Sequence, residues 1–192
     1  MSSITSVSPR TLADVIPGGL ARSVALVVGG AAFVGLTAQV VVPLPFSPVP
    51  LSLQTFSVLL VGAVLGSRRG AASMGLYLVA GVAGVPWFTQ QQSGWAFASF
   101  GYVVGFVLAA YLVGRLAERG ADRTVLRTAG LMVLGNLAIY AVGVPGLVLI
   151  TGMGLGKALL VGVVPFIIGD ALKIALAAGL LPATWKLVDT RR

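Results

Sequence analysis

Apolar residues along this chain form six long runs, and charged residues, prolines or glycines separate one run from the next. A helix that crosses a bilayer needs about 20 apolar residues, so each run is a candidate membrane span. The second and third runs are short, which is typical of tilted helices or of helices surrounded by protein. The predicted spans are residues 21–42, 51–66, 71–85, 99–117, 127–143 and 165–183. The pattern therefore predicts an all-α integral membrane protein, a bundle of six transmembrane helices.

The same runs divide the chain into an N-terminal segment of residues 1–20, a single membrane domain of residues 21–184 and a tail of residues 185–192. Composition agrees with this class, because 57% of the residues are hydrophobic and 9% are charged. Soluble domains are about half apolar and a quarter charged. The first 19 residues are polar and contain proline and glycine, so we predict no cleavable signal peptide.

Positive charges lie on alternate connections between the predicted spans. The N-terminal part holds two Lys and Arg residues, the connection between spans two and three holds two, the region between spans four and five holds four, and the C-terminus holds three, which makes 11 of the 13. Connections rich in Lys and Arg stay in the cytoplasm. Both termini are therefore predicted to be cytoplasmic, and connections 43–50, 86–98 and 144–164 to face outward. Topology explains the net charge of +8, so we predict no nucleic-acid partner.

Several kinds of chemistry are excluded by residues that the chain lacks. It contains no Cys and no His, which excludes disulfides, the usual transition-metal sites and catalysis by a Ser–His or Cys–His pair. Asp170 is the only acidic residue in a predicted span, and there is no phosphate-binding loop of the G-x-x-x-x-G-K-[ST] type. We therefore predict that the chain is not an enzyme, that it holds no metal or cofactor, and that it does not hydrolyse ATP by itself.

The sixth predicted span contains two opposite charges, Asp170 and Lys173. A central Asp or Lys in a membrane helix costs about 2.5–3.5 kcal/mol, so such residues usually have a function. Because they are three positions apart on a helix, they share one face. Together they would offer a ligand one hydrogen-bond acceptor and one donor. The alternative is a self-satisfied ion pair that only braces the bundle.

Other polar residues of the predicted spans are weaker candidates for the same site. Gln54 begins the second span and is followed by Thr55, which is also typical of a helix cap or an interhelical contact. Tyr102 begins the fourth span, where an interfacial belt is the alternative. Asn136 and Tyr140 are four positions apart in the fifth span and would face the same side, although buried amides often only join helices.

The predicted outward connections differ in character from the cytoplasmic ones. Residues 43–50 contain four prolines, which favours an extended, stiff segment. Residues 86–98 contain the aromatic Trp87 and Trp95 and the amide of Gln91, which favours either a lid over a ligand or an aromatic belt at the membrane surface. Residues 157–161 favour a short helix on the membrane surface. We interpret the outer side as the side that binds the ligand.

Small residues line one side of the first predicted span. Ala21, Ala25 and Gly29 recur at every fourth position, and such strips allow another helix to approach closely. The strip is a candidate docking surface for a partner.

Several of these segments, in the same order, resemble the BioY family, the biotin-specific substrate-binding components of energy-coupling-factor (ECF) vitamin transporters. The resemblance extends from about residue 21 to residue 181, and the proline-rich segment followed by the Gly-Asp-x-x-Lys element is its most specific part. The segments that carry it are residues 48–55, 62–66, 84–87, 99–106, 139–145 and 165–173.

The resemblance implies a six-helix protein of the bacterial cell membrane that binds biotin in an outward-facing pocket closed by the outer loops. It implies that Asp170 and Lys173 contact the ligand, with contributions from Tyr102 and the connection of residues 86–98. It also implies two ATPase subunits and a transmembrane coupling subunit as partners, with the Ala21–Ala25 strip docking on the coupling subunit. Two alternatives stay open: a biotin carrier that works without these partners, and a membrane-embedded enzyme or scaffold.

Overall fold

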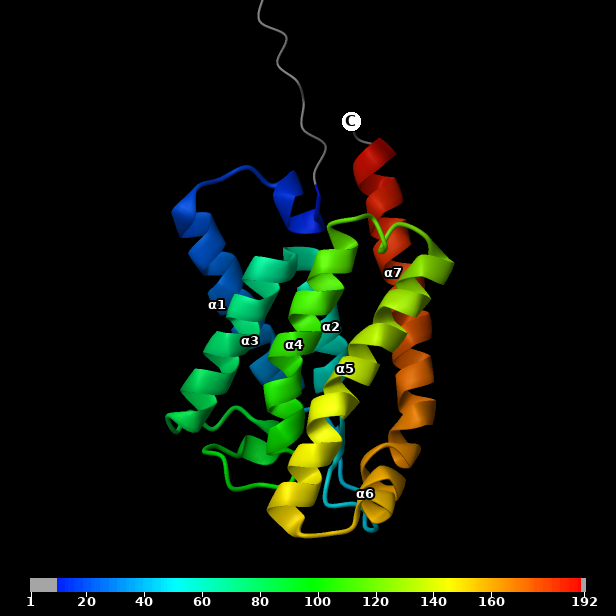
Figure 1. Ribbon diagram of the computed structural model, residues 1–192. Helices are drawn as coiled ribbons and strands as arrows, with labels where there is room; N and C mark the ends of the chain where they lie inside the picture. Colours follow the sequence, from blue (N-terminus) through cyan, green and yellow to red (C-terminus); the bar gives the residue numbers. More distant parts are fainter. Residues whose placement is uncertain (1–9, 191–192) are drawn as a thin grey trace, which may run out of the picture.

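The computed structural model describes residues 10–190, which form a bundle of helices that lie roughly parallel or antiparallel to one another (Figure 1). A short antiparallel ladder pairs Val41 with Ser52 and Val42 with Leu51. The α-helices are α1 (Leu20–Thr37), α2 (Gln54–Leu65), α3 (Ser67–Val82), α4 (Phe100–Ala117), α5 (Val125–Thr151), α6 (Leu155–Gly162) and α7 (Ile167–Thr190). The strands are β1 (Val41–Val42) and β2 (Leu51–Ser52), and the 3₁₀ turns are η1 (Leu12–Val15), η2 (Thr89–Gln91) and η3 (Val164–Phe166).

Helix α4 lies inside the bundle and packs against α2, α3 and α5. Small residues set how closely these helices approach. A Cβ atom added to Gly62 of α2 would lie 2.8 Å from the backbone oxygen of Ala110 in α4, and one added to Gly101 of α4 would lie 2.8 Å from the Cα atom of Gly146 in α5. Close backbone contact through glycine is the usual way in which membrane helices associate.

Four segments of the described chain are long and apolar enough to cross a membrane: Leu20–Thr37, Phe100–Ala117, Val125–Thr151 and Leu155–Thr190. The last of these includes α6 and η3 as well as α7. Helices α2 and α3 have 12 and 16 residues, as the short second and third apolar runs led us to expect. A membrane-embedded, mostly helical fold is therefore supported, and the count of six spans stays a prediction.

The predicted end of the fifth span before Pro145 is wrong. Helix α5 continues through Pro145 and ends at Thr151, where Gly152 adopts a left-handed conformation with φ of 70°. Proline has no backbone N–H group to donate, but membrane helices tolerate the loss of one backbone hydrogen bond. The contact between Gly146 and Gly101 holds this part of α5 against α4. Tertiary packing thus outweighs a local signal that favours a helix end.

The predicted end of the sixth span at residue 183 is also wrong, because α7 continues to Thr190. Trp185, which belongs to the predicted tail, is 2% exposed. Its indole N–H donates a hydrogen bond to Oδ2 of Asp122 at 2.6 Å, and the guanidinium carbon of Arg123 lies 4.3 Å from its ring centre. The end of α7 is therefore anchored to the connection between α4 and α5. Residues 191–192 of the predicted tail and residues 1–9 of the predicted N-terminal segment lie outside the described residues.

Helices α1 and α2 are shorter than the first and second predicted spans, because α1 ends at Thr37 and α2 begins at Gln54. Between them, residues 41–52 form the β1–β2 hairpin, whose turn contains the proline-rich segment. Ser47 in that turn donates a hydrogen bond to the backbone oxygen of Val161 in α6 at 2.7 Å. The hairpin and α6 therefore lie together at one end of the bundle, which we call the hairpin end (Figure 1). The short helix predicted at residues 157–161 is part of α6, which begins at Leu155 and ends at Gly162.

Candidate functional site

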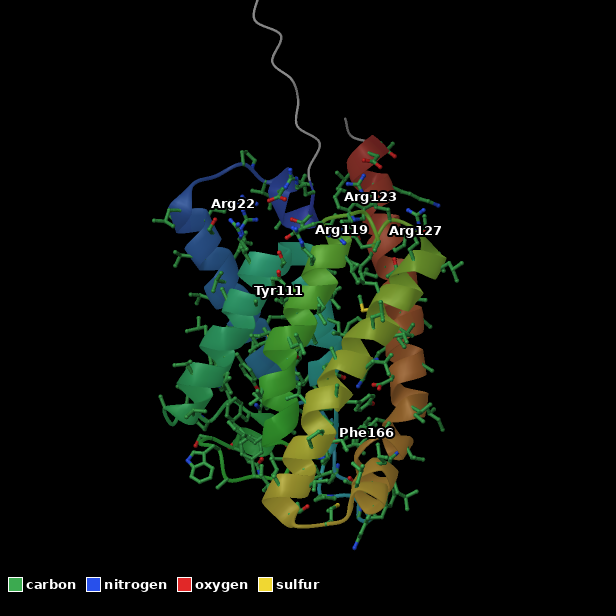
Figure 2. All side chains as sticks on the ribbon, viewed as in Figure 1. Arg22, Tyr111, Arg119, Arg123, Arg127 and Phe166 are labelled. Atoms are coloured by element: carbon green, nitrogen blue, oxygen red, sulfur yellow. The ribbon has the colours of Figure 1, made fainter. Side chains whose placement is uncertain are left out.

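A cavity opens at the hairpin end of the bundle, between α2, α4, α5 and the start of α7. It has an empty volume of about 470 Å³, which includes space open to solvent. The apolar part of its wall includes Val103, Phe106 and Phe166, and Phe166 lies near α6 at this end (Figure 2). The polar part includes Gln54, Thr55, Tyr140, Asp170 and Lys173.

The two charges of α7 face this cavity and are held by two other helices. Lys173 Nζ lies 3.5 Å from Asp170 Oδ1 and donates a hydrogen bond to Thr55 Oγ1 of α2 at 2.9 Å. Tyr140 of α5 donates its hydroxyl proton to Asp170 Oδ2. The Lys173 and Asp170 side chains are 13% and 10% exposed. Three helices therefore fix one carboxylate and one ammonium in a mostly buried position.

This pair retains hydrogen-bonding capacity on both partners. Charge-assisted hydrogen bonds between an ammonium and a carboxylate are normally about 2.7–2.9 Å long, so a separation of 3.5 Å is an ion pair that is longer than a full hydrogen bond. An ammonium has three donors and a carboxylate has about four acceptor positions. Thr55 takes one donor and Tyr140 takes one acceptor position. The remaining groups can serve a ligand with its own donors and acceptors.

Gln54 also lines the cavity, and it links three parts of the structure. Its Nε2 donates to the hydroxyl of Tyr77 in α3 at 2.7 Å, and its Oε1 accepts from Thr89 Oγ1 at 2.8 Å. Tyr77 in turn donates to the backbone oxygen of Trp87 at 2.9 Å. These bonds hold the connection of residues 83–99 against the mouth of the cavity. Since Gln54 is 3% exposed and its amide is bonded at both ends, it shapes the wall.

Tyr102 contributes a wall of the cavity. Its hydroxyl donates to the backbone oxygen of Gly162 in α6 at 2.9 Å, and its ring meets that of Tyr140 edge to face, with ring centres 6.3 Å apart. Gly143 and Gly162 leave the space that this ring occupies, because a Cβ atom at either position would collide with it. The ring therefore joins α4, α5 and α6 around the cavity.

Three candidates from the sequence lie outside the cavity lining. Asn136 is buried and borders a smaller hollow that it shares with Lys173. Trp87 is half-buried and packs on Tyr77, with ring centres 5.0 Å apart. Gln91 is exposed, and its backbone N–H donates to Gln39 Oε1 at 3.3 Å.

The small-residue strip of α1 lies on the exposed side of that helix, where Ala21, Ala25 and Gly29 are all exposed. Ala25 and Gly29 border an apolar groove between α1 and α2, with an empty volume of about 550 Å³. The strip is therefore accessible to another helix.

Sequence reasoning gave Thr55 a lesser role and missed Thr89, Ser99 and Phe166, which also line the cavity. Their residue types carry no specific signal, since threonine and serine at helix ends usually act as caps. The position of Thr55, directly after Gln54 at the outer end of an apolar run, was the one clue available.

Comparison with known proteins identifies the family. The family model of the BioY family matches residues 5–190. The chain belongs to the BioY family. A protein of Rhizobium etli named "Biotin transporter BioY" is 36% identical over 147 residues, which cover 71% of this chain and 78% of the relative. A protein of Pyrococcus horikoshii named "Probable biotin transporter BioY" is 36% identical over 160 residues, which cover 82% of this chain and 92% of the relative.

The BioY fold is shared with a solved structure, the S-component for biotin from an ECF-type ABC transporter. The TM-score is 0.76 at 22% sequence identity, and the match covers 86% of this chain and 92% of that chain. The resemblance inferred from the sequence is thus confirmed. The BioY relatives are transporters and not enzymes, and together with the apolar helices they indicate an integral membrane protein.

Proposed function

We propose that this chain is the high-affinity biotin-binding component of an ECF-type transporter, and that it binds biotin in the cavity at the hairpin end. The observation that carries the proposal is the Asp170–Lys173 pair, which faces the cavity with unused donors and acceptors. We propose biotin as the ligand because the relatives are named as biotin transporters.

The chemistry of biotin fits the lining of the cavity. The bicyclic body needs aliphatic and aromatic walls, which Val103, Phe106 and Tyr102 supply. The ureido ring has two N–H donors and one carbonyl acceptor, and the side chain ends in a carboxylate. Asp170 suits the ureido N–H groups. Lys173 suits either the ureido oxygen or the carboxylate, and the carboxylate gives the stronger charge-assisted bond.

Biotin titration of the isolated chain tests the site. Asp170→Ala and Lys173→Ala should each weaken biotin binding about tenfold or more, equivalent to about 1.4 kcal/mol. Lys157→Ala is the matched control, because Lys157 is exposed on α6 at the same end of the bundle and should leave the affinity unchanged. Full affinity in both site variants would contradict the assignment.

Competing ligands identify the end of biotin that meets Lys173. Desthiobiotin keeps the ureido ring and the carboxylate, lipoate keeps only the carboxylate, and biotin methyl ester keeps only the ureido ring. If Lys173 binds the carboxylate, the methyl ester should bind the wild-type protein about tenfold more weakly than biotin does. The substitution Lys173→Ala should then weaken binding of the ester only little further. If it binds the ureido oxygen, the loss caused by Lys173→Ala should be the same for biotin and for the ester.

The proposed orientation places the hairpin end outside the cell and both chain termini in the cytoplasm, with six helices in the membrane. Arg22, Arg119, Arg123 and Arg127 lie at the opposite end (Figure 2), which supports this orientation by the positive-inside rule. Turn η1 and the last turn of α7 also lie at that end (Figure 1). Cysteines introduced at Lys157 and Arg119 should react with an impermeant thiol reagent from outside and inside the cell, respectively.

We further propose that two ATPase subunits and a transmembrane coupling subunit complete the transporter, and that Ala21, Ala25 and Gly29 dock on the coupling subunit. The exposed position of the strip supports this proposal. Ala25→Leu should abolish co-purification of the coupling subunit while biotin binding by the isolated chain persists. Uptake of biotin by vesicles that hold this chain alone would instead support a self-sufficient carrier.

A further inference from the structure

A second polar pocket lies at the end of the bundle opposite the biotin cavity, which we call the arginine end. It has an empty volume of about 690 Å³ and lies where α2, α3 and α4 meet the N-terminal segment. Six charged side chains line it: Arg10, Asp14, Arg68, Arg69, Arg115 and Glu118. The proposed biotin site does not use this pocket.

The charges of this pocket do not cancel. Arg69 forms an ion pair with Asp14 at 2.9 Å, and Arg115 forms one with Glu118 at 3.2 Å. Arg10 and Arg68 are exposed and form no salt bridge with another residue of the described range 10–190. Four arginines against two carboxylates leave an excess of two positive charges.

The two carboxylates remain ionised at neutral pH. Burial acts to raise the pKa of Asp14, but hydrogen bonds from Arg69 and Thr11 outweigh it and hold the pKa below its ordinary value. The pKa of Glu118 is lowered in the same way, because bonds from Ser67 and Arg115 outweigh burial. The pocket therefore keeps its positive excess over the physiological pH range.

The first turn of α3 already binds one anionic group of this pocket. The N-terminus of a helix carries a partial positive charge and unpaired backbone N–H groups. The backbone N–H of Ser67 donates to Glu118 Oε1 at 2.8 Å, and the Ser67 hydroxyl donates to the same oxygen at 2.7 Å. A negatively charged oxygen is thus already bound on this side of the pocket, and the exposed arginines are left for a second anion.

The pocket adjoins an apolar surface. Leu65, the last residue of α2, lines both the polar pocket and the apolar groove between α1 and α2. Leu26, Phe33 and Val61 continue this groove along the bundle. In the isolated chain, an amphiphile can therefore place its charged group among the arginines and its chain along the groove, the same groove that Ala25 and Gly29 would offer to the coupling subunit in the assembled transporter.

We propose that the arginine pocket binds a phosphate group, and that the headgroup of an anionic phospholipid supplies it. Arginine is suited to phosphate because its planar fork can donate two parallel hydrogen bonds to two oxygens. The excess of two positive charges matches one phosphate with one or two negative charges. Free phosphate shares this chemistry, and the neighbouring apolar groove is the feature that favours the lipid.

Native mass spectrometry of the full chain tests the proposal. The protein is equilibrated with phosphatidylglycerol or with phosphatidylcholine in detergent, and the bound lipid is counted. We expect the wild type to retain phosphatidylglycerol in preference to phosphatidylcholine. The double variant Arg10→Gln/Arg68→Gln should retain about fivefold less phosphatidylglycerol or still less. Biotin affinity, measured in parallel, should be unchanged and shows that the variant is folded.

The matched control is Arg119→Gln/Arg127→Gln. It removes the same charge from exposed arginines at the same end that do not line the pocket. Equal lipid loss in the control and pocket variants, or equal retention of the two lipids by the wild type, would contradict a lipid site. A second experiment measures the melting temperature of the wild type and of the pocket variant with inorganic phosphate. If phosphate stabilises only the wild type, and the wild type shows no lipid preference, the pocket is a phosphate site with a soluble source. No response in either experiment overturns the proposal.

Discussion

At the hairpin end of the bundle, one carboxylate and one ammonium lie 3.5 Å apart beside a cavity, whereas at the arginine end two carboxylates are each bonded to an arginine at 2.9 and 3.2 Å. The side chains of Asp170 and Lys173 are also less exposed than those of Asp14 and Arg69. Burial raises the cost of a charge that is not fully paired. The Asp170–Lys173 pair is thus both more deeply buried and less completely hydrogen-bonded than the ion pairs at the arginine end, so it costs more free energy.

This difference separates two uses of charge. Glu118 satisfies the first turn of α3 and also pairs with Arg115, so its bonds stabilise the fold. Asp170 and Lys173 are bonded only in part by Tyr140 and Thr55. The cost of holding them in this state can be recovered when a ligand completes their hydrogen bonds. The comparison predicts that substitutions at the two ends affect different measurements.

The largest effect is expected when one variant from each end is compared by biotin affinity and by stability. Asp170→Ala should weaken biotin binding about tenfold or more. Glu118→Ala should leave biotin affinity unchanged and lower the free energy of unfolding by about 0.5–2 kcal/mol, because it removes the cap of α3. Titration and thermal unfolding in detergent measure both. If Glu118→Ala also weakened biotin binding, the proposed division between a ligand-binding end and a stabilising end would be wrong.

A buried carboxylate at the arginine end gives the next largest effect. Asp122 is 0% exposed and accepts the indole N–H of Trp185. Asp122→Ala should destabilise the protein by about 1–2 kcal/mol because the buried indole N–H loses its partner. Asp122→Asn keeps an acceptor oxygen of the same size and should cost less. Equal losses in the two variants would show that this hydrogen bond does not anchor α7.

A smaller effect is expected from Tyr140→Phe at the hairpin end. This change removes the hydroxyl that holds Asp170 but keeps the ring that packs on Tyr102. Biotin affinity should fall about threefold, less than for Asp170→Ala, because the carboxylate remains but is less well oriented. A matched control is Tyr111→Phe, since Tyr111 is exposed on α4. An affinity equal to that of the wild type would mean that Tyr140 does not position Asp170.

The smallest effect is a change in the pH dependence of stability. Burial raises the pKa of Asp122 above 3.8, although the bond from Trp185 opposes this. The folded state then binds a proton more tightly than the unfolded state, so this group's contribution to stability falls as pH rises from about 3.8 through the raised pKa. Asp122→Asn should remove this fall. Asp14 and Glu118, whose pKa values are lowered, act oppositely and lose their contribution as pH falls below the ordinary carboxyl range.

The helical fold could be predicted well from the sequence, because apolar runs and the grouping of arginines are local properties of the chain. Two helix ends could not. Pro145 is a strong local signal for an end, yet α5 passes through it because Gly146 packs against Gly101 of α4. Likewise, α7 extends past residue 183 because Trp185 finds a partner in Asp122, 63 positions away. Both outcomes depend on contacts between distant segments.

The candidate site shows the same division. The cost of a charge in an apolar run drew attention to Asp170 and Lys173, and their spacing placed them on one helix face. Their partners were less accessible to prediction, since a threonine at a helix start and a tyrosine in an apolar run have several common roles. Gln91 and Trp87 were plausible from composition, but neither lines the cavity.

By itself, the sequence determined the membrane class, the positions of most helices and the pair of charges on the last one, because these follow from hydropathy and helical periodicity. Only the tertiary structure decided that Thr55 and Tyr140 meet that pair and that four arginines gather at the opposite end. These contacts join residues that are far apart along the chain. They depend on how glycine-rich helix faces pack, and no local pattern encodes that packing.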